Sequence, residues 1–146
     1  MTPDDLAVRQ ATYRLFVQLG QAPTPAEVAA LTGIASEAVP AAWRRLHDAH
    51  ALVLDGAGGI RMLNPFSVVE TPFVVEADGR RWFANCGWDA FGIGAALHVD
   101  STIHTTCADC DEPVDLDVRD GRPTDPGSVF HILVPATQWW SDIGFT

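Results

Sequence analysis

Residues 67–97 read SVVETPFVVEADGRRWFANCGWDAFGIGAAL, and this stretch determines the fold class that we expect. Its first part predicts two strands, because apolar and aromatic residues flank Asp78-Gly79, a strong signal for a tight hairpin turn. Its second part, residues 86–97, predicts a buried helix that Gly92 and Gly94 weaken. A hairpin that continues into an apolar helix indicates a sheet packed on a helix, which is an α+β arrangement.

Further strands are predicted downstream of this helix. The candidates are STIHTTC (101–107), EPVDLDV (112–118) and SVFHILVP (128–135), the last of which is broken by Pro135. Residues 64–146 therefore read as a mixed β-sheet packed on a buried helix.

The N-terminal part of the chain has a different pattern. Apolar spacing predicts a helix over residues 4–19, and Thr24-Pro25-Ala26-Glu27 is a capping box that opens a short second helix. Ser36 is placed to cap a third helix, and LVLDGAGGIRML (52–63) reads as a hairpin. A three-helix module followed by a hairpin is the order of a winged helix, so we expect a winged-helix-like module at 1–63 and a boundary at Asn64-Pro65.

The composition limits the classes of function. The chain of 146 residues has a net charge of −10 and no lysine. Residues 65–146 hold four arginines against thirteen carboxylates. Such an acidic surface repels a phosphate backbone, so nucleic acid is an unlikely partner. Because neither a secretory signal nor a long apolar run is present, we expect a cytoplasmic protein without a membrane contact, whose three cysteines stay reduced.

Cys86 and Asp89 are the first candidates for chemistry. They lie one helical turn apart near a predicted helix start, where Asn85 is a plausible N-cap. Exposed N–H groups at a helix start favour a thiolate, whereas the carboxylate opposes it, so the two groups could share a proton. An inert core thiol remains the alternative. Aromatic neighbours are expected to keep the site dry: Trp82, Phe83, Trp88 and Phe91.

A second cluster lies at residues 104–113, HTTCADCDEP. Cys107 and Cys110 form a C-x-x-C in a turn between two predicted strands, which is typical of half a zinc knuckle, and His104 could supply a third ligand. A zinc site here, a redox pair and incidental thiols are all open on the pattern alone. One alternative function is therefore a non-catalytic metal-binding protein. Another is a metal-responsive winged-helix regulator that reads DNA through Arg44 and Arg45, although a nearly neutral module is a poor DNA-binding surface.

The segments NPFSVVETPFVVEADGRRWFANCGWDAFGIGAAL (64–97) and STIHTTCADCDEPVDL (101–116) resemble the core of the alkylmercury lyases, also called organomercurial lyases. The resemblance is close over 64–118 and loose over 4–63. In that family a winged-helix-like region precedes a strand and a W/F-x-x-C-x-x-D element that opens a helix. Cys86 and Asp89 match this element position for position.

The resemblance implies cleavage of a carbon–mercury bond by protonolysis, giving a hydrocarbon and bound Hg(II). Cys86 would bind mercury as a soft thiolate, and Asp89 would take the thiol proton, deliver it to the departing carbon and contact mercury. The resemblance implies no cofactor. Hg(II) would pass to a small thiol or to a mercuric reductase, and the protein would act in mercury resistance. Cys107 corresponds to a family cysteine usually considered structural, whereas Cys110 is an addition in this chain.

One departure from the family concerns its second reactive cysteine, which lies on a strand late in the sequence. The segment WWSDIGFT (139–146) leads towards that position, and the chain ends at Thr146. We therefore expect a truncated member, in which mercury transfer is impaired unless another sulfur replaces the missing one. Cys107 or Cys110 could do so only if the fold brings one of them beside Cys86.

Overall fold

The computed structural model describes residues 1–132 and 134–144. Its N-terminal part consists of α1 (Pro3–Leu19), α2 (Pro25–Thr32), a 3-10 turn η1 (Ser36–Ala38) and α3 (Val39–Asp48). Thr2 and Thr24 each form a capping box, and Gly20 and Gly33 end the first two helices in the left-handed conformation, both with φ of 73°. The three predicted helices are thus confirmed. The cap expected at Ser36 is wrong, because Ser36 lies in η1 and the N-cap residue of α3 is Ala38, which makes no side-chain hydrogen bond.

Within the described residues the strands form one sheet of eight, in the order β1-β2-β3-β5-β4-β6-β7-β8. The strands are β1 (Val53–Leu54), β2 (Ile60–Leu63), β3 (Phe66–Ser67), β4 (Val74–Ala77), β5 (Arg80–Ala84), β6 (Ser101–Thr106), β7 (Pro113–Arg119) and β8 (Arg122–Pro123). The α+β class is confirmed. The sheet that we expected to be mixed is antiparallel at each pairing in this part of the chain, since short turns join most neighbours.

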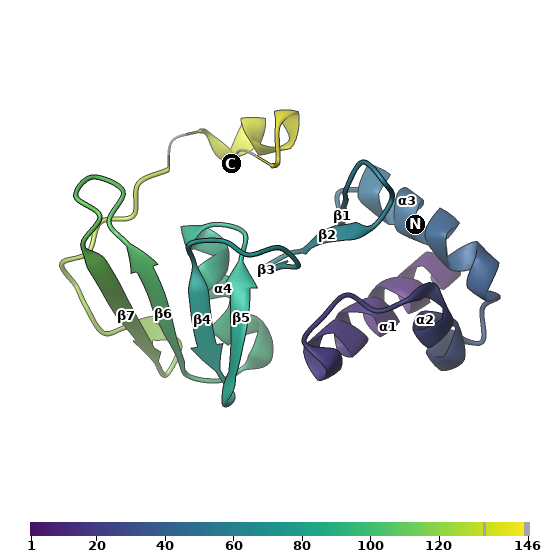
Figure 1. Cartoon of the computed structure of the whole chain (residues 1–146), viewed down its shortest axis with the longest axis horizontal. Helices are drawn as coiled ribbons and strands as arrows, with labels where there is room; N and C mark the ends of the chain where they lie inside the picture. Colours follow the sequence, from purple (N-terminus) through teal and green to yellow (C-terminus); the bar gives the residue numbers. More distant parts are fainter. Residues whose placement is uncertain (133, 145–146) are drawn as a thin grey trace.

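The β4–β5 hairpin and the helix after it are built as predicted. Asp78 and Gly79 both have positive φ, 52° and 69°, as a two-residue hairpin turn requires. Helix α4 (Gly87–Leu97) packs across the sheet against β4, β5, β6 and β3, and Figure 1 shows it behind the central strands. Gly94 permits this close packing, because a Cβ there would lie 2.6 Å from Ser101 Oγ.

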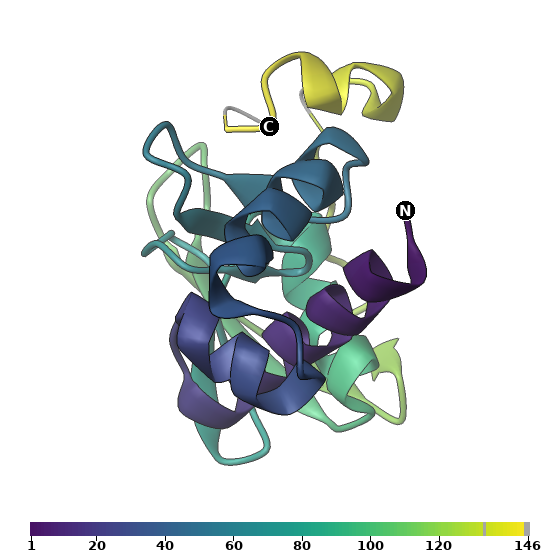
Figure 2. The same cartoon turned by 90° about the vertical axis from the view of Figure 1, so that its right-hand side faces the viewer.

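The helical module and the larger part of the sheet are joined through shared contacts. Strands β2 and β3 pair across the predicted boundary, Met62 with Ser67 and Leu63 with Phe66. The ring of Phe16 from α1 lies 5.5 Å from that of Phe66 and 5.8 Å from that of Trp82. Figure 2 shows the module in front of the sheet. An aromatic cluster therefore connects the first helix to the strands that lead to α4.

Arg45, which a DNA-reading helix would present, has a structural role instead. Its Nε and Nη2 donate to Asp5 Oδ1 at 2.9 and 2.7 Å, and Asp5 is 1% exposed. The guanidinium holds the pKa of the Asp5 carboxyl well below its usual range. One of the two arginines of α3 is thus committed to an ion pair inside the module.

The C-terminal segment, residues 128–132 and 134–144, differs from expectation. The strand predicted at 128–135 is not formed at its described residues, and Leu133 lies outside them. A strand needs a neighbour for its backbone hydrogen bonds, and the outer side of β7 is occupied by β8. The segment instead crosses above the start of α4 and ends in a 3-10 helix, η2 (Ala136–Ser141), whose Trp140 stacks on His50 at 3.9 Å (Figure 1).

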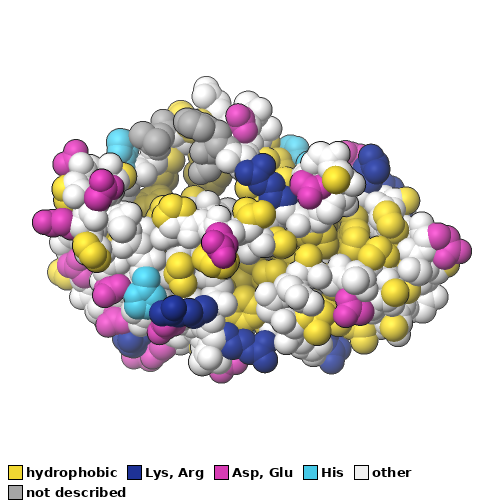
Figure 3. Space-filling view, in the orientation of Figure 1, with side chains coloured by type: hydrophobic (Ala, Val, Ile, Leu, Met, Phe, Trp, Pro, Cys, Tyr) yellow, Lys and Arg dark blue, Asp and Glu magenta, His cyan; other side chains and the backbone are white. Residues whose placement is uncertain are grey.

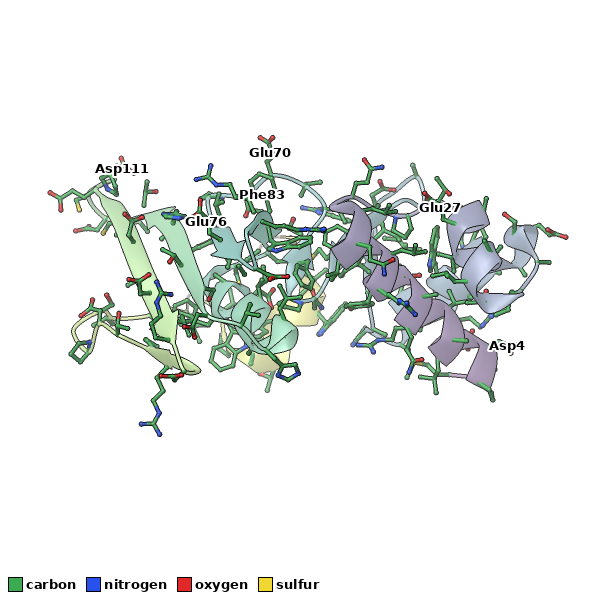
Figure 4. The ribbon with its side chains drawn as sticks, turned by 90° about the horizontal axis from the view of Figure 1, so that it is seen from below. Asp4, Glu27, Glu70, Glu76, Phe83 and Asp111 are labelled. Carbon is green, nitrogen blue, oxygen red and sulfur yellow. The ribbon has the colours of Figure 1, made fainter. Side chains whose placement is uncertain are left out.

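Acidic side chains are spread over both ends of the molecule. Figure 4 shows Asp111 at the tip of the β6–β7 loop and Glu76 on β4, with Glu27 and Asp4 at the starts of α2 and α1. No helix among residues 1–132 and 134–144 is long and apolar enough to cross a membrane.

Candidate active site

Cys86 lies at the junction between β5 and α4. It is the N-cap residue of α4, with φ of −154° and ψ of 179°, and the helix begins at Gly87. The cap is therefore one residue later than Asn85, which we had expected in that role. The extended backbone of a cap residue carries the chain out of the sheet before the helix turns, and this places the thiol at the end of the sheet.

A cavity of about 350 Å³ opens beside Cys86. The body of the protein contributes Met62, Phe73, Asn85, Cys86, Gly87, Trp88 and Ala108, and the C-terminal segment contributes Phe130, His131, Ile132, Val134, Trp139, Ile143 and Gly144. In the space-filling view a hollow lies below that segment, on the side of the β6–β7 loop (Figure 3). Its volume suits a small ligand, and most of its lining side chains are apolar.

The aromatic residues next to Cys86 in sequence have different positions from those expected. Trp82 is 4% exposed and packs in the core against Phe66, while Trp88 is 59% exposed and is the one of the four predicted aromatic residues that lines the cavity. Alternation along β5 directs Trp82 into the core, whereas Trp88 lies in the first turn of α4. Half of the residues that line the cavity beside the thiol come from the distant C-terminal segment.

The Cys86 thiol is half-buried, and burial raises its pKa above the ordinary value. The backbone N–H groups of Asp89 and Trp88 act in the opposite direction, and the charge of Asp89 adds to the increase. The predicted effect of the helix start and the predicted opposing effect of the carboxylate are both present, but desolvation, which sequence reasoning did not weigh, is the largest effect. Cys86 therefore holds its proton at neutral pH.

The Asp89 carboxylate is held from two sides. Asn85 Nδ2 donates to Asp89 Oδ2 at 3.0 Å, and the same amide group lies 3.1 Å from Asn64 Oδ1 and 3.3 Å from the Pro65 carbonyl oxygen. The Cys86 side chain also interacts with this carboxylate. Burial raises the pKa of Asp89, and the interactions with Asn85 and Cys86 counter part of that increase. Asn85, which does not cap the helix, positions the carboxylate.

The arrangement supplies a proton donor and a proton acceptor in contact. At neutral pH the thiol is protonated, because burial raises its pKa, and the carboxylate of Asp89 is the group beside it that can accept the proton. A group that binds the sulfur would displace the thiol proton onto Asp89, where it stays next to the reacting sulfur. This geometry is the requirement for general acid catalysis that follows attack by a nucleophile.

The second predicted cluster is only partly assembled. Cys107 and Cys110 lie together in the β6–β7 loop. The backbone N–H groups of Asp109 and Cys110, and after them the Cys110 thiol, lower the pKa of Cys107. His104 is engaged elsewhere: its Nδ1 lies 2.6 Å from Asp115 Oδ1 and its Nε2 lies 3.7 Å from Glu76 Oε2. No group of three or more potential ligands is assembled in the described residues, so a zinc site at His104, Cys107 and Cys110 is not supported.

Several cavity residues were missed by sequence reasoning. Phe130, His131 and Ile132 belong to the segment that was predicted to be a strand, and all three line the cavity with Trp139. Phe130 packs directly on Gly87, where a Cβ would overlap its ring. The apolar pattern of 128–135 was the available signal, but it does not show that the segment folds back over a residue more than 40 positions earlier.

Comparisons with known proteins agree with this geometry. The family model of alkylmercury lyase (MerB) matches residues 66–146, more than half of the chain. A crystal structure of the mercury-bound form of MerB2 is similar, with a TM-score of 0.68 and 25% sequence identity over 86% of this chain. The chain spans 60% of the length of that protein. A search of curated proteins gave no match. The family match covers the cavity, its thiol and its carboxylate, and the chain belongs to the alkylmercury lyase family.

Proposed function

We propose that this protein cleaves the carbon–mercury bond of small organomercurials by protonolysis, releasing a hydrocarbon and Hg(II). The observation that carries the proposal is the placement of the Cys86 thiol at the N-cap of α4 and of the Asp89 carboxylate in its first turn, where the two groups interact beside a largely apolar cavity. Membership of the alkylmercury lyase family and the similarity to a mercury-bound relative support the same substrate class.

The first step is substrate binding. The mercury of R–Hg–X bonds to the Cys86 sulfur, because a soft thiolate is the preferred ligand of a soft metal, and X leaves with its electron pair. The thiol proton passes to Asp89, whose carboxylate lies one helical turn away and interacts with the Cys86 side chain. The raised pKa of Asp89 helps the acid form to keep this proton until the carbon departs, instead of losing it to solvent.

The second step breaks the carbon–mercury bond. Asp89 returns the proton to the carbon, and the electron pair of the carbon–mercury bond forms the new C–H bond. Hg(II) remains on Cys86, with a second ligand from solvent or from a small thiol, and its oxidation state does not change. A carboxylate contact to mercury, expected for Asp89, would keep the acid within reach of the carbon.

The cavity supplies the environment of these steps. Side chains of Phe73, Trp139 and Ile143 surround the space beside the thiol, so an alkyl or aryl group can replace water there. The product Hg(II) would be taken up by a small thiol or by a mercuric reductase, in a cytoplasmic setting where thiols stay reduced. This assignment places the protein in mercury detoxification.

Phenylmercury turnover tests the proposal. The purified chain is incubated with phenylmercury and excess small thiol, and benzene is measured in the headspace. We expect Cys86→Ser to reduce benzene release by at least about a thousandfold, because the serine hydroxyl does not replace a soft thiolate as mercury ligand. Asp48→Asn, a change at an exposed carboxylate at the end of α3, serves as the control and should retain the original rate.

The proposal is wrong if the unmodified chain, shown to be folded, binds phenylmercury at Cys86 and releases no benzene. Equal turnover by Cys86→Ser and by the unmodified chain would also contradict it.

A further inference from the structure

The β6–β7 loop leaves the sheet at the same end as Cys86. Val74 of β4 pairs with Phe83 of β5 on one side and with His104 of β6 on the other. Three residues after Phe83 the chain reaches Cys86, and three residues after His104 it reaches Cys107. Since β5 and β6 flank β4, the two strands lie about two strand spacings, or about 10 Å, apart. Figure 1 shows the end of β5 and the β6–β7 loop on the same edge of the sheet.

The loop also forms part of the wall of the Cys86 cavity. Ala108, which lies between the two loop cysteines, lines it together with Cys86. Backbone hydrogen bonds close the loop, from Cys107 N–H to the Glu112 oxygen at 2.8 Å and from Asp111 N–H to the Cys107 oxygen at 3.0 Å. This closed loop keeps the two thiols side by side, and Cys110 is exposed while Cys107 is half-buried.

We propose that Cys107 and Cys110 form a dithiol site that accepts Hg(II) from Cys86. The inference rests on the proposed lyase function for the source of the metal, but the site itself follows from the loop. Two thiolates satisfy Hg(II), a soft ion, so the site needs no third ligand. His104 takes no part, because it is engaged by Asp115 and Glu76.

The transfer is a ligand exchange. Two bonds to Hg(II) break: the bond to the Cys86 sulfur and the bond to its second ligand, a hydroxide or a small thiolate. Two sulfur–mercury bonds form in their place, to Cys107 and to Cys110. One of the two protons released by the loop thiols goes to the Cys86 sulfur and the other to the displaced ligand. The exchange needs no oxidant or reductant, and it restores the protonated Cys86 with which the next substrate must react.

The test of this proposal is to identify which cysteines hold mercury after one turnover. The full chain receives one equivalent of phenylmercury without added thiol; benzene is measured, and free thiols are then alkylated and identified by peptide mass. We expect alkylation of Cys107 and Cys110 to fall by at least about tenfold relative to the mercury-free chain, while Cys86 reacts again. In the double variant Cys107→Ser/Cys110→Ser, Cys86 should stay protected. Asp111→Asn, in the same loop with both thiols intact, is the matched control.

Two further arms separate the outcomes. One equivalent of mercuric chloride replaces phenylmercury, so that a chain that releases no benzene, which refutes the lyase function, still reports where Hg(II) binds. Transfer within one chain does not depend on protein concentration. Tenfold dilution of the protein should therefore leave the distribution of mercury among the three cysteines unchanged. Protection of Cys86 with free Cys107 and Cys110 in the mercuric chloride arm would overturn the dithiol site.

Discussion

Cys86 and the Cys107–Cys110 pair lie at the same end of the sheet, but their burial and their neighbours differ. Cys86 is half-buried beside a carboxylate, and burial raises its pKa; Cys107 lies in a surface loop beside another thiol, and its pKa is lowered. In the function that we propose, this difference separates two tasks of a thiol. Cys86 would keep a proton available for the substrate, and the Cys107–Cys110 pair would offer sulfur ready to bind a metal.

The largest expected difference between the two positions is their reactivity towards an alkylating reagent. At pH 7 we expect iodoacetamide to modify Cys107 at least about tenfold faster than Cys86, since the thiolate reacts and burial disfavours the thiolate at Cys86. Time-resolved peptide mass spectrometry measures both rates in one sample. In urea the alkylation rates of Cys107 and Cys86 should converge, because unfolding exposes both thiols. Equal rates in the folded chain would contradict the difference between the two positions.

The pH dependence of benzene release tests the setting of Asp89. The carboxylate must be ionised to accept the thiol proton, so activity should fall as the pH drops through the raised pKa of Asp89, above the usual range of an aspartate. Asn85→Ala removes a hydrogen bond that lowers this pKa. The acidic limb of the pH profile of benzene release should therefore move to higher pH, by up to about one unit.

Asn64→Ala is the matched control for this change. It removes a contact of the same Asn85 amide but leaves the bond from Asn85 to Asp89. The limb should stay in place; a limb that shifts equally in both variants would assign the effect to general loosening of the site.

The smallest expected effect concerns the cavity wall. A Cβ at Gly87 would overlap the ring of Phe130, so Gly87→Ala should displace that ring from the cavity. We expect KM for phenylmercury to rise about threefold with little change in kcat, because the change affects binding and leaves Cys86 and Asp89 in place. Gly56→Ala, with no atom within 4 Å of the added Cβ, is the control. Unchanged KM would mean that Phe130 does not contact the substrate.

Local signals explain how much of the fold could be predicted. Thr24 and Asp78-Gly79 act within a few residues, so the start of α2 and the β4–β5 turn followed from the sequence. The fate of residues 128–135 could not be predicted in the same way. Their apolar pattern fits a strand, but whether Phe130 pairs in a sheet or covers Gly87 depends on contacts between distant parts of the chain.

The candidate site shows the same division. The spacing of Cys86 and Asp89 and their resemblance to the family element predicted that the two groups act together, and the structure brings them into contact. The net direction of the Cys86 pKa shift was not predictable, because it depends on how deeply the fold buries the thiol, and no local pattern shows that.

The most direct test of the central claim is a single-turnover experiment with Asp89→Asn and phenylmercury. Cys86 should still bind the substrate, because the sulfur is intact, and the intact-mass spectrum should show a stable phenylmercury adduct. Benzene release should slow by about a hundredfold or more, since asparagine cannot return a proton to carbon. Release at the rate of the unmodified chain would show that Asp89 does not carry the proton and would contradict this account.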